Sequence, residues 1–387
     1  MSEHRFVRSG CILAGLLSAA LLLGLPLDGQ AAPPDPRPEP DEEEVNFEEE
    51  EAASDQEAAE MKGAAGGGHG GGPGLGVKIF ADLLVEHPVG AEKFEFTPHH
   101  QHVILQVLMT DDLMFAIHIS DDPIYYELVY SITPHLRLRA GKLFVPFGTN
   151  EFHHIIGGRV DELSSFLPET WTDYGVGIQH SFYDGEHLSA AYDFYVINGF
   201  QGVDRPVFGT GVTSDNNMNK GIGARLRLDF LGHYAFIGSL YYDVWDSSDS
   251  RILLFYSLGL ELNKGFIDLP VLERIGLRGE WSRGEVQLSG QNDQQGVLEH
   301  AFARAGFYGE LTVQLLEQLS FRFRTGRVNP DNTVEDEGDL WVFEPALIIG
   351  SGKLTLRVAY QMTKQVGEDY SAKNPPDMAY AKFFLQY

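Results

Sequence analysis

The chain is poor in cysteine, in basic residues and in long apolar runs. Its single cysteine, Cys11, lies near the start, so the rest of the chain has no disulfide, thiolate metal site or thiol nucleophile. Asp and Glu (56) outnumber Lys and Arg (28), which disfavours nucleic acid as a partner. No apolar run after the first 31 residues approaches the length of a membrane-spanning helix. The remainder is therefore either soluble after export or crosses a membrane as strands.

The first 31 residues have the pattern of a secretory signal peptide. Basic residues precede an apolar run at 10–27, and small residues at 29 and 31 suit a signal peptidase. We expect cleavage after Ala31. The alternative is a retained membrane helix, which Pro26 and the small residues disfavour.

Residues 32–75 form a separate region that is rich first in proline, then in glutamate and then in glycine. Such a stretch cannot bury enough apolar surface to fold alone, and its glycines make a flexible tether. We expect a disordered periplasmic tail. As an alternative, residues 45–61 form a short helix that docks on a partner or assembles an oligomer.

From residue 76 to 387 the sequence alternates apolar and polar residues in short segments separated by turn residues. The pattern is clearest in KLTLRVAYQM (353–362), where every second residue is apolar. Sixteen strands are predicted, at 77–86, 102–110, 113–119, 124–133, 136–146, 175–182, 188–199, 220–231, 234–245, 251–264, 274–285, 303–315, 318–328, 339–350, 353–365 and 377–387.

The links between these strands alternate in length. Links after even strands are mostly short, such as TDD and TPH, whereas links after odd strands include most of the long ones. Short turns on one rim, long loops on the other and an even strand number are typical of bacterial outer-membrane barrels. We therefore predict an all-β, transmembrane antiparallel barrel of about 16 strands with both termini in the periplasm. A soluble β-sandwich or solenoid is the alternative.

Two stretches carry a family resemblance. RLRAGKLFVPFGTNEFHH (137–154) and FLPETWTDYGVGIQ (166–179) resemble the phosphate-selective porin O/P-like family of outer-membrane proteins. The matching residues are Gly141, Lys142, Pro146, Phe147, Gly148, His153, Asp173, Gly175 and Val176. The resemblance implies a passive channel, often a homotrimer, for small ions or solutes. It leaves the solute open.

If apolar faces meet lipid, the opposite faces line a lumen in which bases and acids are nearly balanced. The expected pore-lining bases are Arg137, Arg139, Arg225, Arg227, Arg278, Arg322, Arg324 and Arg357, with Lys78, Arg304 and Lys382 on the same faces. The expected acids are Glu280, Glu310 and Glu344, with Asp82, Glu127, Asp193, Asp229, Asp243 and Glu261. One interpretation is a network of ion pairs that stiffens the wall. The other is an arginine band that guides small anions, although acids in the expected loops would repel anions at long range.

The loop at 148–174 is expected to fold into the channel and form its constriction, as the corresponding loop commonly does in 16-stranded porins. Its charged candidates are Glu151, His153, His154, Arg159, Asp161 and Glu162. Histidines also cluster in TPHHQH, where His99, His100 and His102 are candidate zinc or copper ligands, with simple solvation as the alternative.

The chain ends on AKFFLQY, in which Phe383, Leu385 and Tyr387 alternate. We expect these residues to face lipid on the last strand, to sit at the interface belt and to serve as a signal for the barrel assembly machinery. We expect no cofactor and no enzymatic activity, because no nucleophile or acid–base pair has a spaced partner. The functional hypotheses are a porin for passive diffusion and, as an alternative, a structural barrel that sheathes or docks a partner such as an electron-transfer cytochrome.

Overall fold

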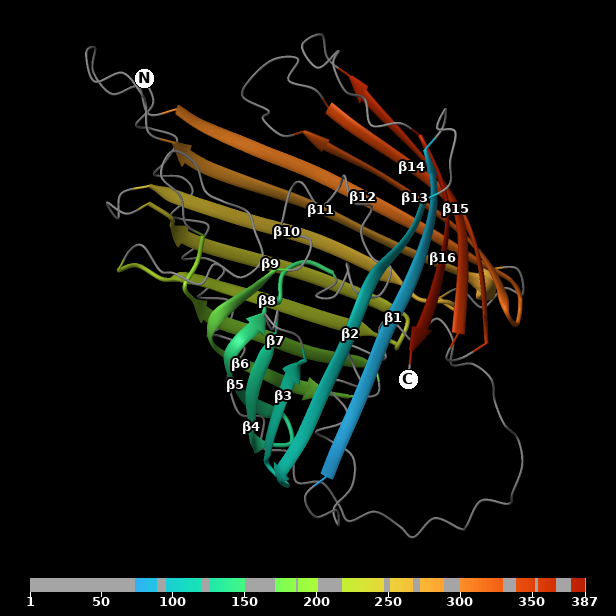
Figure 1. Cartoon of the computed structure of the whole chain (residues 1–387). Helices are drawn as coiled ribbons and strands as arrows, with labels where there is room; N and C mark the ends of the chain where they lie inside the picture. The colour runs from blue at the N-terminus through green and yellow to red at the C-terminus, as the bar shows by residue number, and fades with distance from the viewer. Residues whose placement is uncertain are drawn as a thin grey trace. The chain divides into compact units, whose positions relative to one another are not determined.

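Sixteen antiparallel strands close into one barrel (Figure 1). The computed structural model describes residues 74–88, 95–119, 125–149, 171–185, 187–200, 218–246, 251–266, 272–288, 300–329, 339–351, 354–366 and 377–386. The expected signal peptide at 1–31 lies outside these residues, as does the expected tail at 32–75 except for its last two residues. Those two residues belong to the first strand, which begins at Gly74.

Each of the sixteen predicted strands is present. They are β1 (Gly74–Pro88), β2 (Glu95–Thr110), β3 (Leu113–His118), β4 (Tyr126–Thr133), β5 (Leu136–Phe144), β6 (Thr172–Asp184), β7 (Leu188–Ile197), β8 (Gly221–Phe230), β9 (Tyr234–Val244), β10 (Ile252–Leu262), β11 (Ile275–Leu288), β12 (His300–Leu316), β13 (Leu319–Asn329), β14 (Asp339–Ser351), β15 (Leu354–Val366) and β16 (Met378–Gln386). A single 3-10 turn, η2 (Leu272–Arg274), precedes β11 in the described part of the chain.

The largest difference from the predicted ends is at β2, which begins at Glu95 and not at residue 102. The hairpin with β1 continues past TPHHQH because its register shifts by one residue there. His100 pairs with Asp82 and Pro98 pairs with Leu83, so His99 has no partner opposite it. Such a β-bulge lets a strand continue past a residue that the ladder cannot pair.

Strand alternation turns apolar side chains outward and polar ones inward. On β10, Ser257 and Glu261 are each 1% exposed. Leu258 and Leu260, which lie between them in the sequence, are 65% and 39% exposed. Because successive side chains on a strand point to opposite faces, each strand divides cleanly between the two surfaces of the barrel. The outer surface is therefore mainly apolar, with exceptions such as Arg283 and Glu285 on β11, and most of the charge lies on the inner surface.

The barrel closes where β1 pairs with β16, with Leu83 opposite Phe383 and Pro88 opposite Met378. Every strand thus has two hydrogen-bonded neighbours, and the sheet has no free edge. Among the described residues, no helix combines the length and the apolar composition that a helical membrane span needs.

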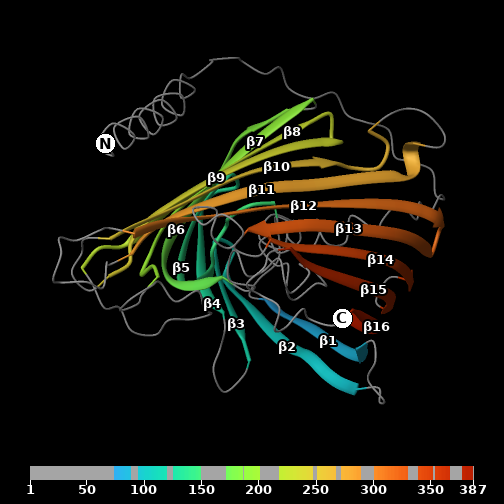
Figure 2. The ribbon, with the colours of Figure 1, turned by 90° about the horizontal axis from the view of Figure 1, so that it is seen from above.

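The two rims of the barrel differ in the lengths of the links between strands. Figure 2 shows the strands of the barrel from above. Even-numbered strands are followed by short turns such as 111–112, 134–135 and 317–318, and the exception is 263–274. Odd-numbered strands are followed by longer links, above all 145–171 and 198–220. We call the two ends of the barrel the short-turn rim and the long-loop rim.

Candidate functional site

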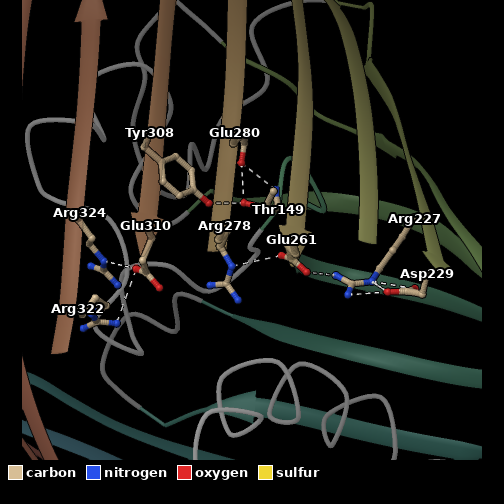
Figure 3. Close-up of polar contacts among 10 residues, drawn as sticks. All are labelled: Thr149, Arg227, Asp229, Glu261, Arg278, Glu280, Tyr308, Glu310, Arg322 and Arg324. Atoms are coloured by element: carbon tan, nitrogen blue, oxygen red, sulfur yellow. Dashed lines mark hydrogen bonds and ion pairs between the residues drawn. The ribbon is translucent and has the colours of Figure 1, made fainter. Parts of the chain in front are cut away.

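A row of ion pairs crosses the inner wall in the half nearer the short-turn rim (Figure 3). On β8, Arg227 binds Asp229 at 2.8 Å, and the same guanidinium reaches Glu261 on β10 at 2.9 Å. Glu261 also lies 3.4 Å from Arg278 on β11. The predicted inward placement of these arginines therefore brings them together with carboxylates of neighbouring strands.

The row continues on β12 and β13, where one carboxylate faces two arginines. Glu310 binds the Nε of Arg324 and lies 3.8 Å from the Nη1 of Arg322. Arg278 is the register partner of Glu310 on the other side. Two guanidinium groups therefore contact one acid, so this part of the wall has one more base than acid.

A further pair joins β14 to β15. Arg357 binds Glu344, and Tyr380 on β16 donates a hydrogen bond of 2.9 Å to the same carboxylate. The Arg357 guanidinium lies 5.4 Å from the centre of the Tyr380 ring, within range of a cation–π contact. Lys382 on β16 is the register partner of Arg357.

On the opposite part of the wall, Arg139 on β5 binds Glu127 on β4 at 2.7 Å. Arg137 lies two residues before Arg139 on the same face of β5, and its register partner on β6 is Gln179. Arg225 on β8 is the register partner of Asp193 on β7, and both side chains are buried. The ion-pair interpretation of the lumen is thus the one that the geometry favours for most of the expected set.

The charge is nevertheless unevenly divided around the wall. On β11–β16, the described inward side chains include five bases and three acids. These are Arg278, Arg322, Arg324, Arg357 and Lys382, against Glu280, Glu310 and Glu344. Lys78, Asp82 and Arg304 lie on described strands, but their side chains lie outside the described set.

An aromatic cluster fills part of the lumen towards the long-loop rim. Its rings come from the wall strands β7, β9 and β10 and from the links after β5, β7 and β9. Trp171 is the central ring, at 4.8 Å from Tyr241, 5.1 Å from Phe200 and 5.8 Å from Phe147 between ring centres. The alternating sequence pattern did not predict this cluster. One signal was present in YAFIGSLYYDV (234–244), where Tyr241 places an aromatic ring on the inward face between Ser239 and Asp243.

The link after β5 starts by crossing the lumen. Gly148 donates its backbone N–H to Ser239 on β9 at 2.9 Å. The backbone N–H and the hydroxyl of Thr149 both donate to Oε2 of Glu280 on β11, each at 2.8 Å, and the hydroxyl also contacts the Tyr308 hydroxyl on β12 (Figure 3). We call this contact of Gly148 and Thr149 with the wall the latch.

The same link returns to the wall inside the barrel. Trp171 sits in the aromatic cluster, and its carbonyl accepts a 2.9 Å hydrogen bond from the N–H of Val145. Thr149 and Trp171 therefore both lie inside the barrel. The expected constriction residues Glu151, His153, His154, Arg159, Asp161 and Glu162 lie outside the described residues.

A second link, after β7, also turns inward, which the sequence did not indicate. The N–H of Gly199 donates to Asp173 at 2.7 Å, and the N–H of Phe200 donates to Asp243 at 2.6 Å. Tyr241 supplies a further donor to Asp243 at 3.0 Å. Asp243 was predicted to line the pore, but its carboxylate holds the loop backbone instead and is fully buried.

The histidine candidates for a metal lie on β2 and not in a loop. His100 and His102 share one face of that strand, since they are two residues apart, whereas His99 is the bulged residue. Their side chains lie outside the described set. Within the described ranges, no group of three or more His, Cys, Asp or Glu residues could hold a metal ion.

Solved outer-membrane proteins superpose on the barrel. OmpT of Vibrio cholerae matches with a TM-score of 0.56 and 8% identity, over 82% of this chain and 99% of its own. The outer membrane channel DcaP of Acinetobacter baumannii matches with a TM-score of 0.55 and 10% identity, over 83% and 99% of the two chains. A refined porin structure matches with a TM-score of 0.51 and 11% identity, over 81% and 100%.

The chain has the porin fold. No protein-family model and no curated protein matches it in sequence. The predicted all-β barrel of 16 strands is therefore confirmed. The finer resemblance to the phosphate-selective porin O/P-like family stays a prediction, for which the porin fold supplies only general support. The alternative of a partner-docking barrel rests on the tail at 32–75, nearly all of which lies outside the described residues.

Proposed function

We propose that the protein is a porin of the bacterial outer membrane, through which small ions or hydrophilic solutes diffuse passively. One observation carries the proposal: a closed barrel with an apolar outer face surrounds a lumen lined by ion pairs. Exposed side chains such as Leu258 and Val176 cost free energy in water but not in hydrocarbon. A closed barrel also leaves no backbone group unsatisfied in the bilayer.

We further propose that the channel prefers small anions. The surplus of bases on β11–β16 supports this preference, because guanidinium groups suit carboxylate and phosphate oxygens. The acids that give the whole chain its formal charge of −28 act over longer distances and are screened by salt beyond about 8–10 Å. Charge at the narrowest point therefore dominates selectivity.

We propose a homotrimer as the assembled form and place the short-turn rim and both termini in the periplasm. One of the superposed structures, OmpT of Vibrio cholerae folded in vitro, is a trimer form, with a TM-score of 0.53 and 8% identity over 82% of this chain and 100% of its own. The placement of the termini follows from the short turns on the rim where β1 begins and β16 ends.

Planar-bilayer recording tests the proposed function. Purified, folded protein is expected to give discrete conductance steps, and in a KCl gradient the reversal potential is expected to have the sign of a chloride-preferring pore. Heat-modifiable migration in gels serves as the control that the barrel is folded. A folded barrel without conductance would contradict the channel, and a potassium-preferring reversal potential would contradict anion preference alone.

A further inference from the structure

We propose that Glu280 is a positioning residue, which fixes the start of the loop after β5 on the far wall of the lumen and so sets the width of the aperture. The inference rests on the proposed channel function and deepens it. Glu280 was predicted to line the pore. Glu280 is 5% exposed, and one of its carboxylate oxygens accepts two hydrogen bonds from the loop.

The link after β5 reaches the opposite wall of the barrel within five residues. β5 ends at Phe144, and Thr149 already contacts β11 and β12, although five strands separate β5 from β11 along the wall. The five residues from Val145 to Thr149 span at most about 18 Å when extended. They must therefore cut across the lumen, and the latch is where this crossing segment meets the opposite wall.

The wall and the loop are shaped to meet closely. Gly148 has a φ of +75°, which favours glycine, and a Cβ there would overlap the carboxylate of Glu280. A Cβ on Gly259 of β10 would overlap the Cγ2 of Thr149. The loop and the wall thus each have a glycine at the point of contact, Gly148 in the loop and Gly259 on β10. Glycine is common where a second backbone approaches a strand.

The carboxylate of Glu280 is satisfied by neutral donors. Thr149 supplies two hydrogen bonds to Oε2, and the Ser282 hydroxyl supplies one to Oε1 at 2.8 Å. A buried charge without such bonds would be strongly unfavourable. Three donors hold this carboxylate, and removing it would leave the Thr149 backbone N–H without a partner inside the barrel.

The latch has a direct consequence for the solute path. It holds the crossing segment against β9–β12, and the aromatic cluster fills the lumen on the long-loop side of the same wall. Solutes therefore pass between this segment and the remaining wall, where Arg322, Arg324 and Arg357 lie. In this proposal the latch sets one edge of the aperture, and the arginines of β13 and β15 lie on the wall beyond it.

Substitution of Glu280 is the first test. Glu280→Ala is expected to raise the single-channel conductance and the open-channel current noise, because the crossing segment loses its anchor. Glu280→Gln keeps an acceptor oxygen and is expected to restore most of the wild-type conductance. Ser257→Ala is the matched control, since Ser257 is a buried residue on the same wall that lies outside the latch. Glu280→Ala with wild-type conductance and noise would overturn the proposal.

A reversible disulfide between the loop and the wall gives a second test, which remains informative if Glu280→Ala does not fold. The double variant Thr149→Cys/Gly259→Cys places two thiols at the point of closest approach, and the sequence contains no cysteine beyond Cys11. Under oxidant we expect a disulfide, seen as a mobility shift in a non-reducing gel, and wild-type conductance. After reduction we expect conductance and noise to rise.

The outcomes of the tether separate the latch from the channel. Failure to form the disulfide in a heat-modifiable, folded barrel would place the loop elsewhere and overturn the latch. A disulfide that forms but whose reduction leaves conductance unchanged would overturn its role in setting the aperture. Wild-type protein without conductance would instead refute the channel, whatever the gel shows.

Discussion

At the scale of single residues, the lumen is organised by carboxylates that each serve several donors. Glu310 contacts Arg322 and Arg324, and Glu261 contacts Arg227 and Arg278. Leaving one partner of a buried ion pair alone costs far more than an exposed pair contributes. The acids therefore hold like-charged arginines together on one wall.

Glu310→Gln is expected to destabilise the barrel and to change its selectivity. Loss of the carboxylate leaves Arg322 and Arg324 uncompensated, with a cost of about 3 kcal/mol in the free energy of unfolding. The same change adds net positive charge to the lumen, so the reversal potential in a KCl gradient should shift towards that of chloride. Urea titration of the gel-mobility transition measures the first effect, and bilayer recording the second.

The control for this variant is Glu285→Gln on β11. Glu285 faces outward and pairs with Arg283 at 3.4 Å, but both side chains are more than a third exposed. An exposed pair contributes less than about 1 kcal/mol, and this one lies outside the lumen. Equal effects of the two variants on selectivity would contradict a role for Glu310 in the pore.

At the scale of elements, two links fold inward and share one aromatic cluster. The link after β5 contributes Phe147 and Trp171, and the link after β7 contributes Phe200. These rings pack against Tyr241 and Phe255 of the wall, at inward positions that would otherwise face water. The cluster therefore gives the loops a hydrophobic core that the barrel wall alone does not provide.

Trp171→Ala is expected to lower the free energy of unfolding by about 3–5 kcal/mol, because it opens a cavity among packed rings. It should also raise conductance, since the return of the loop after β5 loses its anchor. Trp281→Ala is the matched control, because Trp281 lies on the outer face and is 39% exposed, against 8% for Trp171. A smaller loss of stability for Trp171→Ala than for the control would contradict the importance of the cluster.

The sequence predicts these elements better than it predicts their contacts. Alternation in segments such as 353–362 and the lengths of the links were sufficient for the strand number and the inward faces, because both depend on local pattern. Glu280 was assigned to the pore since it shares a face with Arg278. Its partner Thr149 lies 131 residues away, and no local pattern signals a contact made only when the barrel closes. The bulge at His99 was not predicted for a similar reason, because the strand was expected to begin at residue 102 and only the pairing with β1 extends it to Glu95.

At the scale of the whole molecule, closure depends on the last strand. β16 pairs with β15 on one side and with β1 on the other, and Leu83 of β1 faces Phe383. Leu385 is the register partner of Ala81, whereas Tyr387 lies outside the described residues. We call the pairing of β1 with β16, which closes the barrel, the seam. The end of the chain is therefore a structural part of the seam, in addition to its proposed role as an assembly signal.

Deletion of residues 383–387 is expected to prevent membrane assembly and not only to lower stability. It removes the partners of β1 from Phe80 to Leu83, which leaves β1 with an unpaired edge. Membrane fractionation and heat-modifiable migration measure the outcome, with Lys382→Gln as a control that keeps the seam. Normal amounts of heat-modifiable, membrane-inserted protein after the deletion would contradict the prediction.

The seam also determines the order in which this chain can acquire its structure. Fifteen of the strand pairings join consecutive strands and can form as local hairpins, whereas the pairing of β1 with β16 joins the two ends of the sheet. Forming such a distant contact carries the largest loop-closure entropy, so we expect it to come last and to limit the rate. Until that step the chain is an open sheet with two unpaired edges and an apolar face, the form most prone to aggregation. A chaperone or an assembly factor would therefore be needed for the time that this one pairing takes.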